Sequence, residues 1–569
     1  TNALDISGFA IYNSSLIDAK QRTVKQFTDS DLGIPNELTE QTSHERSDQG
    51  LLKLSASYKP NGSNQMDYDV LSRISKDSQN QNLVSDVIGN TSQLDETTPF
   101  SINQNLNYYY TLNETNIFAF EAQHLLKDED PFYNAIIEDK ENYESTGVSI
   151  GLDGDQQNYN INQNRRIKSS QLDAKLDYYY IINPKSNLNV TFGSIFSHQK
   201  FNSNLFQFLD DGLAFNPTPN FNNGLAINDI EYNFKDIYLG AHYRLKVGKF
   251  TITPGFSLHS YGNNNTQFGQ KFKDNFFKIM PDFETRVQFK NSESLTLRYD
   301  MQNQFTDITK LAQGLVLNNF SNIQFGEPEL QNALSHNLSL LYSSFNLFNY
   351  TNVFARLAYS KNIDQIRNIT SFENVISTNT FFNSNFADES ATAFGRIQRT
   401  FGKLIASVNL SFNYSKINQL IDSRRSVNTG FTRSYTPRLR TNFKKAPNIS
   451  LKYKYTVSIN NQGPNETTFY TSAPSLDFDA YIWKSVTLKT DYTFTNQSLR
   501  GGNSDNFQTW NASISYRKNR DTKWEFEVVA TNLLDIDSKV SNTATNLFVS
   551  ESRIFIQPRF ITFRLRYEL

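Results

Sequence analysis

The sequence predicts an all-β protein: a single transmembrane antiparallel β-barrel of about 22 strands, with short turns at one end and long loops at the other. Three observations predict this fold. Apolar and polar residues alternate strictly along many segments, as they do in a strand with two unlike faces. The chain is polar on average, yet it contains 46 Phe and 29 Tyr. Short turns and longer polar loops follow each other in alternation.

The C-terminal segment shows the alternation most clearly. One side is apolar and consists of Ile561, Phe563, Leu565, Tyr567 and Leu569. The other side is polar and consists of Thr562, Arg564, Arg566 and Glu568. An open sheet edge in lipid would leave backbone groups unpaired at several kcal/mol each. We therefore expect this strand to close against a first strand near Leu4–Asn13, with its apolar side facing lipid and its charged side facing a polar lumen.

Two hairpins in the middle of the chain repeat this pattern around turns at Asn183–Ser186 and Asn291–Ser294. By parity, charged side chains of the second hairpin point into the lumen: Glu284, Arg286, Arg298 and Asp300. We expect them to pair with one another rather than to bind a substrate. Aromatic residues close to the tight turns are candidates for an interfacial girdle on the lipid face: Tyr178, Tyr180, Phe345, Tyr350 and Trp483.

The turns and loops fix the predicted topology. The tight turns are Pro60–Asn64, Asn113–Asn116, Asn183–Ser186, Val247–Lys249, Asn291–Ser294, Asn346–Asn349, Phe401–Lys403, Lys445–Asn448, Lys484–Ser485 and Lys518–Thr522. The long loops include Ser14–Ser43, Lys127–Asn164, Phe201–Asp229 and Asn303–Asn332. In an outer-membrane barrel the short turns are periplasmic and the long loops extracellular. Both chain ends would then lie on the periplasmic side.

Composition excludes several other classes of protein. The 55 Lys and Arg nearly balance the 57 Asp and Glu, so no global field favours nucleic acid. No run approaches the length of a membrane helix, and Cys is absent. A soluble sandwich or propeller is the alternative, but neither linkers nor a repeated blade motif occur. The chain begins at Thr1 and reads as a mature or trimmed product, so residues 1–569 are expected to form one barrel domain.

Three stretches resemble the barrel of TonB-dependent outer-membrane receptors. In "FGEPELQNALSHNLSLLYS", residues Gly326, Pro328, Leu330, Ser335 and Leu338 match a segment that opens a mid-barrel strand in this family. In "EVVATNLLDID", Asn532–Asp535 match a motif of a late strand. The closing "IQPRFITFRLRYEL" is similar to the terminal signature of the family, although Leu569 replaces the usual final Phe.

The resemblance implies energised import, without bond chemistry: a ligand binds at the extracellular loops and passes through the barrel when an inner-membrane complex acts on a plug. The first predicted strand begins near Leu4, so neither a plug nor a TonB-engaging segment precedes it here. We therefore expect a plug domain or partner to fill the lumen, with TonB engaged through a segment outside this chain. The alternatives are a structural barrel subunit of a larger assembly, compatible with an extracellular lipoprotein lid, and a passive porin-like channel.

Motifs for other chemistry are weak. "GVSIG" (Gly147–Gly151) matches a nucleophile elbow at Ser149, but it falls in a polar loop of an all-β chain. The six His residues lack the spacing of metal ligands. Acidic residues gather between Lys127 and Asn164 and could hold Ca²⁺ as surface oxygen ligands, although "DGDQQN" lacks the register of a calcium loop. We therefore expect no catalytic residue, no resident metal and a solvated acidic loop.

Overall fold

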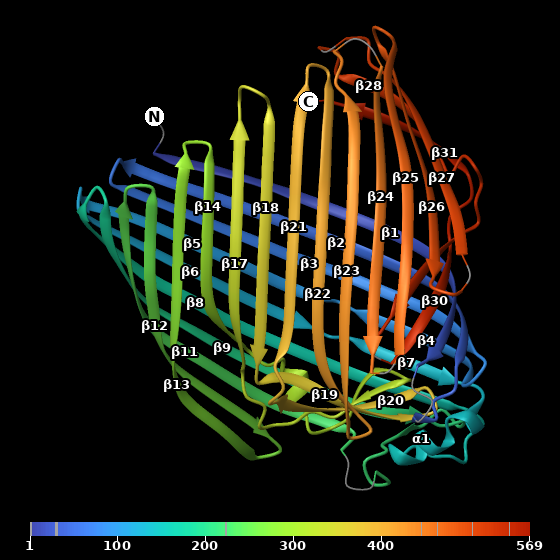
Figure 1. Ribbon diagram of the computed structural model, residues 1–569. Coiled ribbons are helices and arrows are strands. Elements are labelled where there is room, and N and C mark those ends of the chain that lie inside the picture. The colour runs from blue at the N-terminus through green and yellow to red at the C-terminus, as the bar shows by residue number, and fades with distance from the viewer. Residues whose placement is uncertain are drawn as a thin grey trace.

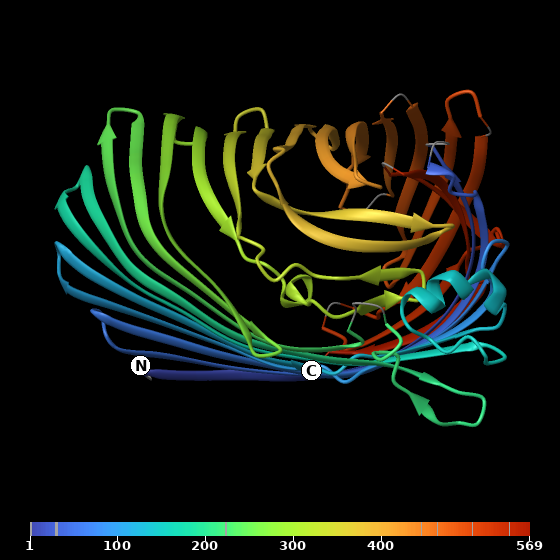
Figure 2. The same ribbon diagram turned by 90° about the horizontal axis from the view of Figure 1, so that it is seen from below.

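One β-sheet forms most of the molecule. The computed structural model describes residues 3–28, 32–221, 225–444, 447–463, 465–502, 504–519, 521–545 and 547–568. Within these ranges all 31 strands belong to a single sheet, which curls round a lumen (Figures 1 and 2). Within the same ranges, no helix is long and apolar enough to cross a membrane.

The strands pair almost entirely with antiparallel neighbours. The first half of the wall consists of β1 (Leu4–Phe27), β2 (Glu37–Asn61), β3 (Asn64–Ser85), β4 (Gly89–Thr97), β5 (Phe100–Asn113), β6 (Asn116–Glu129), β7 (Phe132–Ile137), β8 (Tyr159–Asn183), β9 (Ser186–Phe208), β11 (Ile227–Val247), β12 (Phe250–Gln267), β13 (Gln270–Lys290) and β14 (Glu293–Gln304). The second half consists of β17 (Ala333–Asn346), β18 (Thr351–Ile363), β21 (Asp388–Phe401), β22 (Leu404–Ile421), β23 (Arg424–Thr441), β24 (Asn448–Gln462), β25 (Asn465–Trp483), β26 (Val486–Leu499), β27 (Ser504–Tyr516), β28 (Trp524–Thr531), β29 (Ser538–Ala544), β30 (Phe548–Phe555) and β31 (Phe560–Tyr567).

Short elements gather at the long-loop end. They are β10 (Ala214–Phe215), β15 (Val316–Asn319), β16 (Asn322–Gln324), β19 (Gln365–Glu373), β20 (Ile376–Ser384), the helix α1 (Glu144–Ser149) and the 3-10 turns η2 (Lys140–Asn142) and η3 (Ile308–Leu311). Several predicted single strands are interrupted by kinks, as β4 and β5 show. The predicted strand count therefore stays a prediction, whereas the all-β antiparallel class is confirmed.

Each predicted tight turn connects two antiparallel neighbours. Two of these turns, Lys445–Asn448 and Lys518–Thr522, include residues outside the described ranges. Figure 1 shows that both chain ends lie at the same end of the barrel as these turns, opposite α1, β19 and β20.

The opposite end differs from the prediction, because several of its connections are short. Only Phe268–Gly269 separates β12 from β13, and only Asp422–Ser423 separates β22 from β23. The predicted loop Ser14–Ser43 is mostly strand, since β1 extends to Phe27 and β2 starts at Glu37. Polar residues on both faces identify water-exposed chain, but backbone pairing continues there as long as each strand has a neighbour. Polar residues on both faces therefore predicted that these segments are exposed to water, but they did not predict whether the backbone forms a loop or a strand.

Register assigns the two faces of the sheet, because residues paired across a ladder point to the same side. In β8, Tyr159 and Ile161 are fully buried under the loops at the barrel mouth, so odd-numbered residues of this strand face inward. Even-numbered residues, among them Leu176 and Tyr178, therefore face outward. Successive registers carry this assignment from strand to strand.

The barrel closes only along part of its seam. β1 pairs with β30 from Gln21 to Phe27, whereas β31 pairs with β28. In the described part of the chain, no ladder joins the Leu4–Lys20 edge of β1 to β31. The expectation that the last strand closes against Leu4–Asn13 is therefore wrong in this structure.

A corner in the last two strands explains the open part of the seam. The side chain of Asn532, at a positive φ of 51°, donates to the carbonyls of Ile536 and Gln557 at 2.8 and 2.9 Å. These hydrogen bonds connect the segment between β28 and β29 to the segment between β30 and β31. Asn532 belongs to the late-strand motif, so this motif fixes the corner at which the closing strand leaves β1.

Engineered cysteine pairs test this seam in a chain that has no native Cys. Thr23 and Ser552 are register partners with hydroxyls 3.0 Å apart, so Thr23→Cys with Ser552→Cys should form a disulfide under mild oxidation. The control pair is Tyr12→Cys with Phe563→Cys, which would face each other only if the β1–β30 register continued. We expect it to stay reduced in a non-reducing gel; equal cross-linking of both pairs would show a seam closed along its full length.

Candidate functional site

The mouth of the barrel at the long-loop end is crossed by its own chain. Residues 305–332, which include η3, β15 and β16, run across the lumen, and the β19–β20 hairpin lies beside them (Figure 2). We call residues 305–332 the crossing segment. Its apolar side chains enter two buried clusters together with inward-facing residues of the wall, such as Leu205 and Ile230. The loops therefore form a packed cap and not a fringe in solvent.

Wall side chains hold the crossing segment in place of a strand partner. Gln163 of β8, which is fully buried, donates to the Leu315 carbonyl at 3.1 Å and accepts from the Leu317 amide at 2.9 Å. A primary amide has both a donor and an acceptor, so it can pair with backbone as another strand would. The chain can thus cross the lumen without leaving these buried backbone groups unpaired.

The same device recurs on three other strands. Gln267 of β12 donates to the Leu311 carbonyl at 2.6 Å and accepts from the Gln313 amide at 3.1 Å. Two further residues complete the set. The Asn228 side chain binds Gly314 N at 2.8 Å and Leu315 O at 3.2 Å, and the Asn383 side chain binds both N and O of Gln331 at 2.8 Å. We call Gln163, Asn228, Gln267 and Asn383 the amide clamps.

Tyrosines connect the α1 loop to the crossing segment. Tyr133 of β7 accepts from the Phe320 amide at 2.8 Å, and Tyr143 donates to the Phe320 carbonyl at 2.8 Å. Tyr143 lies outside the strands, and its burial raises the pKa of its phenol well above the ordinary value. The hydroxyl therefore stays protonated and keeps donating at any pH compatible with folding.

The mid-barrel motif belongs to this cap. Gly326 N donates to the Ala312 carbonyl at 2.6 Å, and Glu327 N donates to the Lys310 carbonyl at 2.8 Å. A Cβ at Gly326 would lie 2.4 Å from backbone atoms of the crossing segment, which explains why glycine stands there. The motif was predicted to open a strand, and β17 does begin at Ala333.

The sequence-predicted lumen residues lie on the face that register assigns as inward. Glu284 is the register partner of Arg298, whose Nε lies 3.4 Å from Asp300. At the C-terminus the inward charges pair across the β28–β31 ladder: Arg564 with Glu527 at 3.6 Å, and Arg566 with Glu525 at 3.1 Å and with Glu527 at 3.2 Å. Beyond this ladder, Glu568 pairs with Arg517. Arg286 faces Thr296. Their role in lining a lumen stays a proposal, as does any ligand contact.

Most of the girdle candidates lie on the outward face. Tyr178, Tyr180, Phe563, Leu565 and Tyr567 share the outward face, and a bulge between Tyr481 and Trp483 brings Trp483 opposite outward-facing Val486. Tyr350 lies in the turn at a positive φ of 49°. Phe345 is the exception, because its parity with Ser343, the partner of inward-facing Ser294, places it on the inner face. Proximity to a turn was the signal used for Phe345, and proximity does not specify a face.

Sequence analysis missed an inner-face cluster on β11 and β12. His259 Nδ1 lies 2.9 Å from both Asp236 carboxylate oxygens, and its Nε2 lies 2.8 Å from Ser257 Oγ. The connectivity is that of a hydrolytic triad. However, Ser257 has ladder partners on both sides, Gly240 and Met280, so its backbone amide belongs to the sheet and cannot serve an oxyanion. A period-two Ser-x-His opposite an Asp was the only signal available in the sequence.

The weak motifs have structural explanations. Ser149 ends α1 and donates to the Thr146 carbonyl at 2.7 Å, so it does not lie on a strand-to-helix elbow. In the acidic loop, Asp128 accepts two bonds from Arg166, and Asp153 accepts from the Asp155 amide. No group of three or more acidic, His or Cys side chains is arranged for a metal in the described ranges.

Comparison with known proteins gives matches in structure only. No family model matches the chain, and no curated protein matches it. The chain is similar to solved receptors and transporters. They include the siderophore receptor PirA from Pseudomonas aeruginosa (9% identity, 95% of this chain and 80% of that one, TM-score 0.42). Another is the FrpB iron transporter from Neisseria meningitidis (10% identity, 95% of this chain and 81% of that one, TM-score 0.44). A third is the copper transporter OprC (8% identity, 96% of this chain and 80% of that one, TM-score 0.45).

These TM-scores are too low to carry an argument about this chain. The description of its fold depends on its own antiparallel ladder and on the register of its two faces.

The amide clamps can be tested by removing two of them. The double variant Gln163→Ala with Gln267→Ala should release the crossing segment, because each change leaves a buried amide and a buried carbonyl unpaired, at about 1–3 kcal/mol per group. In planar bilayers its unitary current should exceed that of the parent chain. The matched control is Gln199→Ala, since Gln199 also faces inward but bonds to Ser197 of its own strand. A double variant that conducts like this control would show that the clamps do not hold the cap.

Proposed function

We propose that this chain is the barrel domain of an outer-membrane transporter resembling the TonB-dependent receptors, importing a ligand captured at the long-loop end. The observation that carries the proposal is the asymmetry of the barrel. One end has tight turns and both chain ends, and the other has a folded cap held by the wall. In this proposal the cap end is extracellular and the short-turn end periplasmic.

A partner inside the lumen also fits the inner face near the short-turn end. Phe345, Phe354 and Phe394 share this face, are 39–41% exposed, and two of them lie with ring centroids 5.9 Å apart (Phe354 and Phe394). Exposed aromatic rings in a polar lumen cost free energy unless another surface covers them. We therefore propose a plug domain or partner at this position.

A structural barrel subunit of a larger assembly is the second candidate. The same uncovered aromatic rings favour it, because a static partner would cover them as well as a transported plug. An uptake measurement distinguishes energised import from a structural role and from a passive channel.

Metabolite uptake should be compared in cells with and without the protein, each with and without a protonophore. Chain-dependent uptake that the protonophore abolishes supports import; resistance to it indicates a passive channel, and no chain-dependent uptake favours the structural role.

The lipid-facing assignment predicts unequal effects along the last strand. Phe563 is 80% exposed on the outer face, so Phe563→Arg should destabilise the inserted barrel by about 2 kcal/mol or more. The neighbouring Arg564→Gln should cost about 0.2–1 kcal/mol, since it removes only a half-exposed pair with Glu527. Heat-modifiability on gels and urea unfolding in vesicles measure both changes. Equal losses would contradict the assignment of the two faces.

The proposed topology predicts which connections can be labelled on intact cells. Epitope tags after Asp155 and at Gly212, both beside the cap, should be labelled from outside. Tags between Pro184 and Lys185 and between Asn291 and Ser292 should be labelled only after the outer membrane is opened. Labelling of either turn on intact cells would invert the topology.

A further inference from the structure

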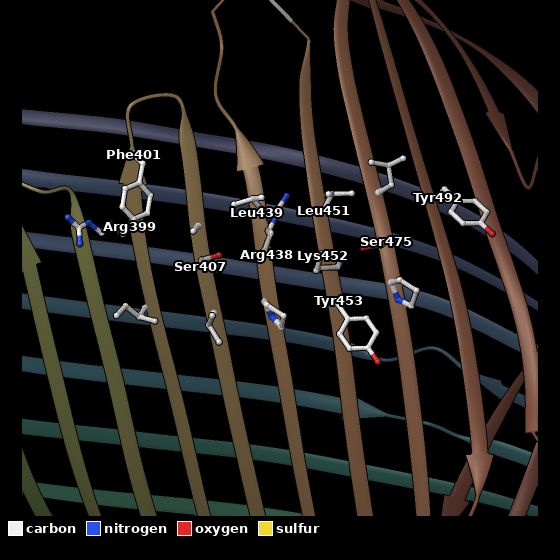
Figure 3. A pocket seen from close by; sticks show the side chains of 16 residues that line it. Arg399, Phe401, Ser407, Arg438, Leu439, Leu451, Lys452, Tyr453, Ser475 and Tyr492 are labelled. Carbon is white, nitrogen blue, oxygen red and sulfur yellow. The ribbon is translucent and has the colours of Figure 1, made fainter.

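A long hollow crosses the outside of the barrel in its second half. It has a volume of 760 Å³ and extends over β21 to β26 (Figure 3). Its outward-facing walls are apolar: Ile397, Phe401, Ala406, Val408, Pro437, Leu439, Leu451, Tyr453, Pro474, Leu476 and Tyr492. Six strands at a spacing of about 4.8 Å make it roughly 24 Å long.

Two prolines explain why the wall is hollowed here. Pro437 of β23 and Pro474 of β25 have no amide hydrogen, and the ladders are interrupted beside each of them. The β23–β24 register skips the position where Pro437 would face Tyr453. The β25–β26 register skips the position where Pro474 would face Phe494. With Ala406 as the small residue on β22, these positions leave a depression bordered by Phe401 and Tyr453.

Register places the hollow on the lipid side. Pairings from β14 through β17, β18, β21, β22 and β23 connect outward-facing Tyr299 to the face that carries Leu439 and Leu451. Leu439, Leu451 and Tyr453 are 43%, 53% and 44% exposed, as expected of side chains that nothing in the protein covers. The inward neighbour Arg438 instead pairs with Asp477 at 3.4 Å.

The hollow has a cationic end. Arg399 is exposed on the outer face with its guanidinium 4.8 Å from the Phe401 ring centroid. Lys403, in the next turn, and Lys444, after β23, lie at the same short-turn end. The residues that line the hollow include no Asp or Glu. An apolar trough with a cationic end is complementary to a lipid chain with an anionic head.

We propose that this trough binds one anionic glycerophospholipid of the leaflet at the short-turn end. One acyl chain occupies the hollow over the prolines, and the phosphate group lies against Arg399. The hollow runs across the strands, so an acyl chain in it lies flat against the wall between β21 and β26. The inference rests on the proposed position of the barrel in a membrane. It adds a ligand site remote from the cap and the lumen.

The experiment is native mass spectrometry of the folded 569-residue chain, delipidated in detergent and titrated with phosphatidylglycerol or phosphatidylethanolamine. The parent chain should retain one phosphatidylglycerol at about fivefold lower lipid concentration than phosphatidylethanolamine, since one surface cation contributes roughly this factor. Arg399→Gln should remove the preference. Ala406→Trp should fill the hollow and abolish retention of both lipids.

The matched control is Ala241→Trp, the same change at an outward-facing position of β11 that does not line the hollow. It should retain phosphatidylglycerol like the parent chain. Heat-modifiability confirms that each variant is folded and inserted, so a failure of lipid retention is distinguished from a failure of the barrel itself. The proposal is overturned if the folded Ala406→Trp variant retains phosphatidylglycerol as well as Ala241→Trp does. It is also overturned if the parent chain retains both lipids equally, which is the result expected of adventitious boundary lipid only.

Discussion

A sheet that crosses hydrocarbon must pair its own backbone groups, because no water is there to replace a missing partner. In the proposed membrane position, this requirement accounts for the long antiparallel ladders of the wall. Antiparallel neighbours satisfy each strand along nearly all of the wall, so the side chains are free to alternate between the outer and the inner face. The ladder is incomplete at several places in the described chain, among them the Leu4–Lys20 edge of β1 and the positions beside Pro437 and Pro474.

The cap solves the same problem by another route. The crossing segment runs over the lumen and not along a wall strand, although its β16 part pairs with β20. Side-chain amides of Gln163, Asn228, Gln267 and Asn383 substitute for backbone partners, while apolar residues of the segment pack against wall residues. Each clamp comes from a different strand, so the segment is coupled to a large part of the barrel mouth.

Charge on the inner face follows a related logic. A carboxylate or guanidinium facing a confined lumen is costly unless it is paired or hydrated. The pairs formed by Arg564 and Arg566 with Glu525 and Glu527 tie the last strand to its neighbour from inside. The aromatic rings of Phe354 and Phe394 lie against each other on the same face and remain 39% and 41% exposed, which is why a lumen partner is part of the proposed function.

The sequence by itself determined the all-β fold class and the positions of the tight turns, and it predicted two unlike faces for the most regular strands. These properties depend on local period and turn chemistry, which a single strand carries by itself. Tertiary structure decided how far the strands continue into polar sequence, where the seam ends and which side Phe345 takes. It also decided that Gln163 and Gln267 hold a segment about 150 and 45 residues away along the chain. A glutamine is equally compatible with a solvated loop or a buried clamp, and only the backbone brought to it in space distinguishes the two.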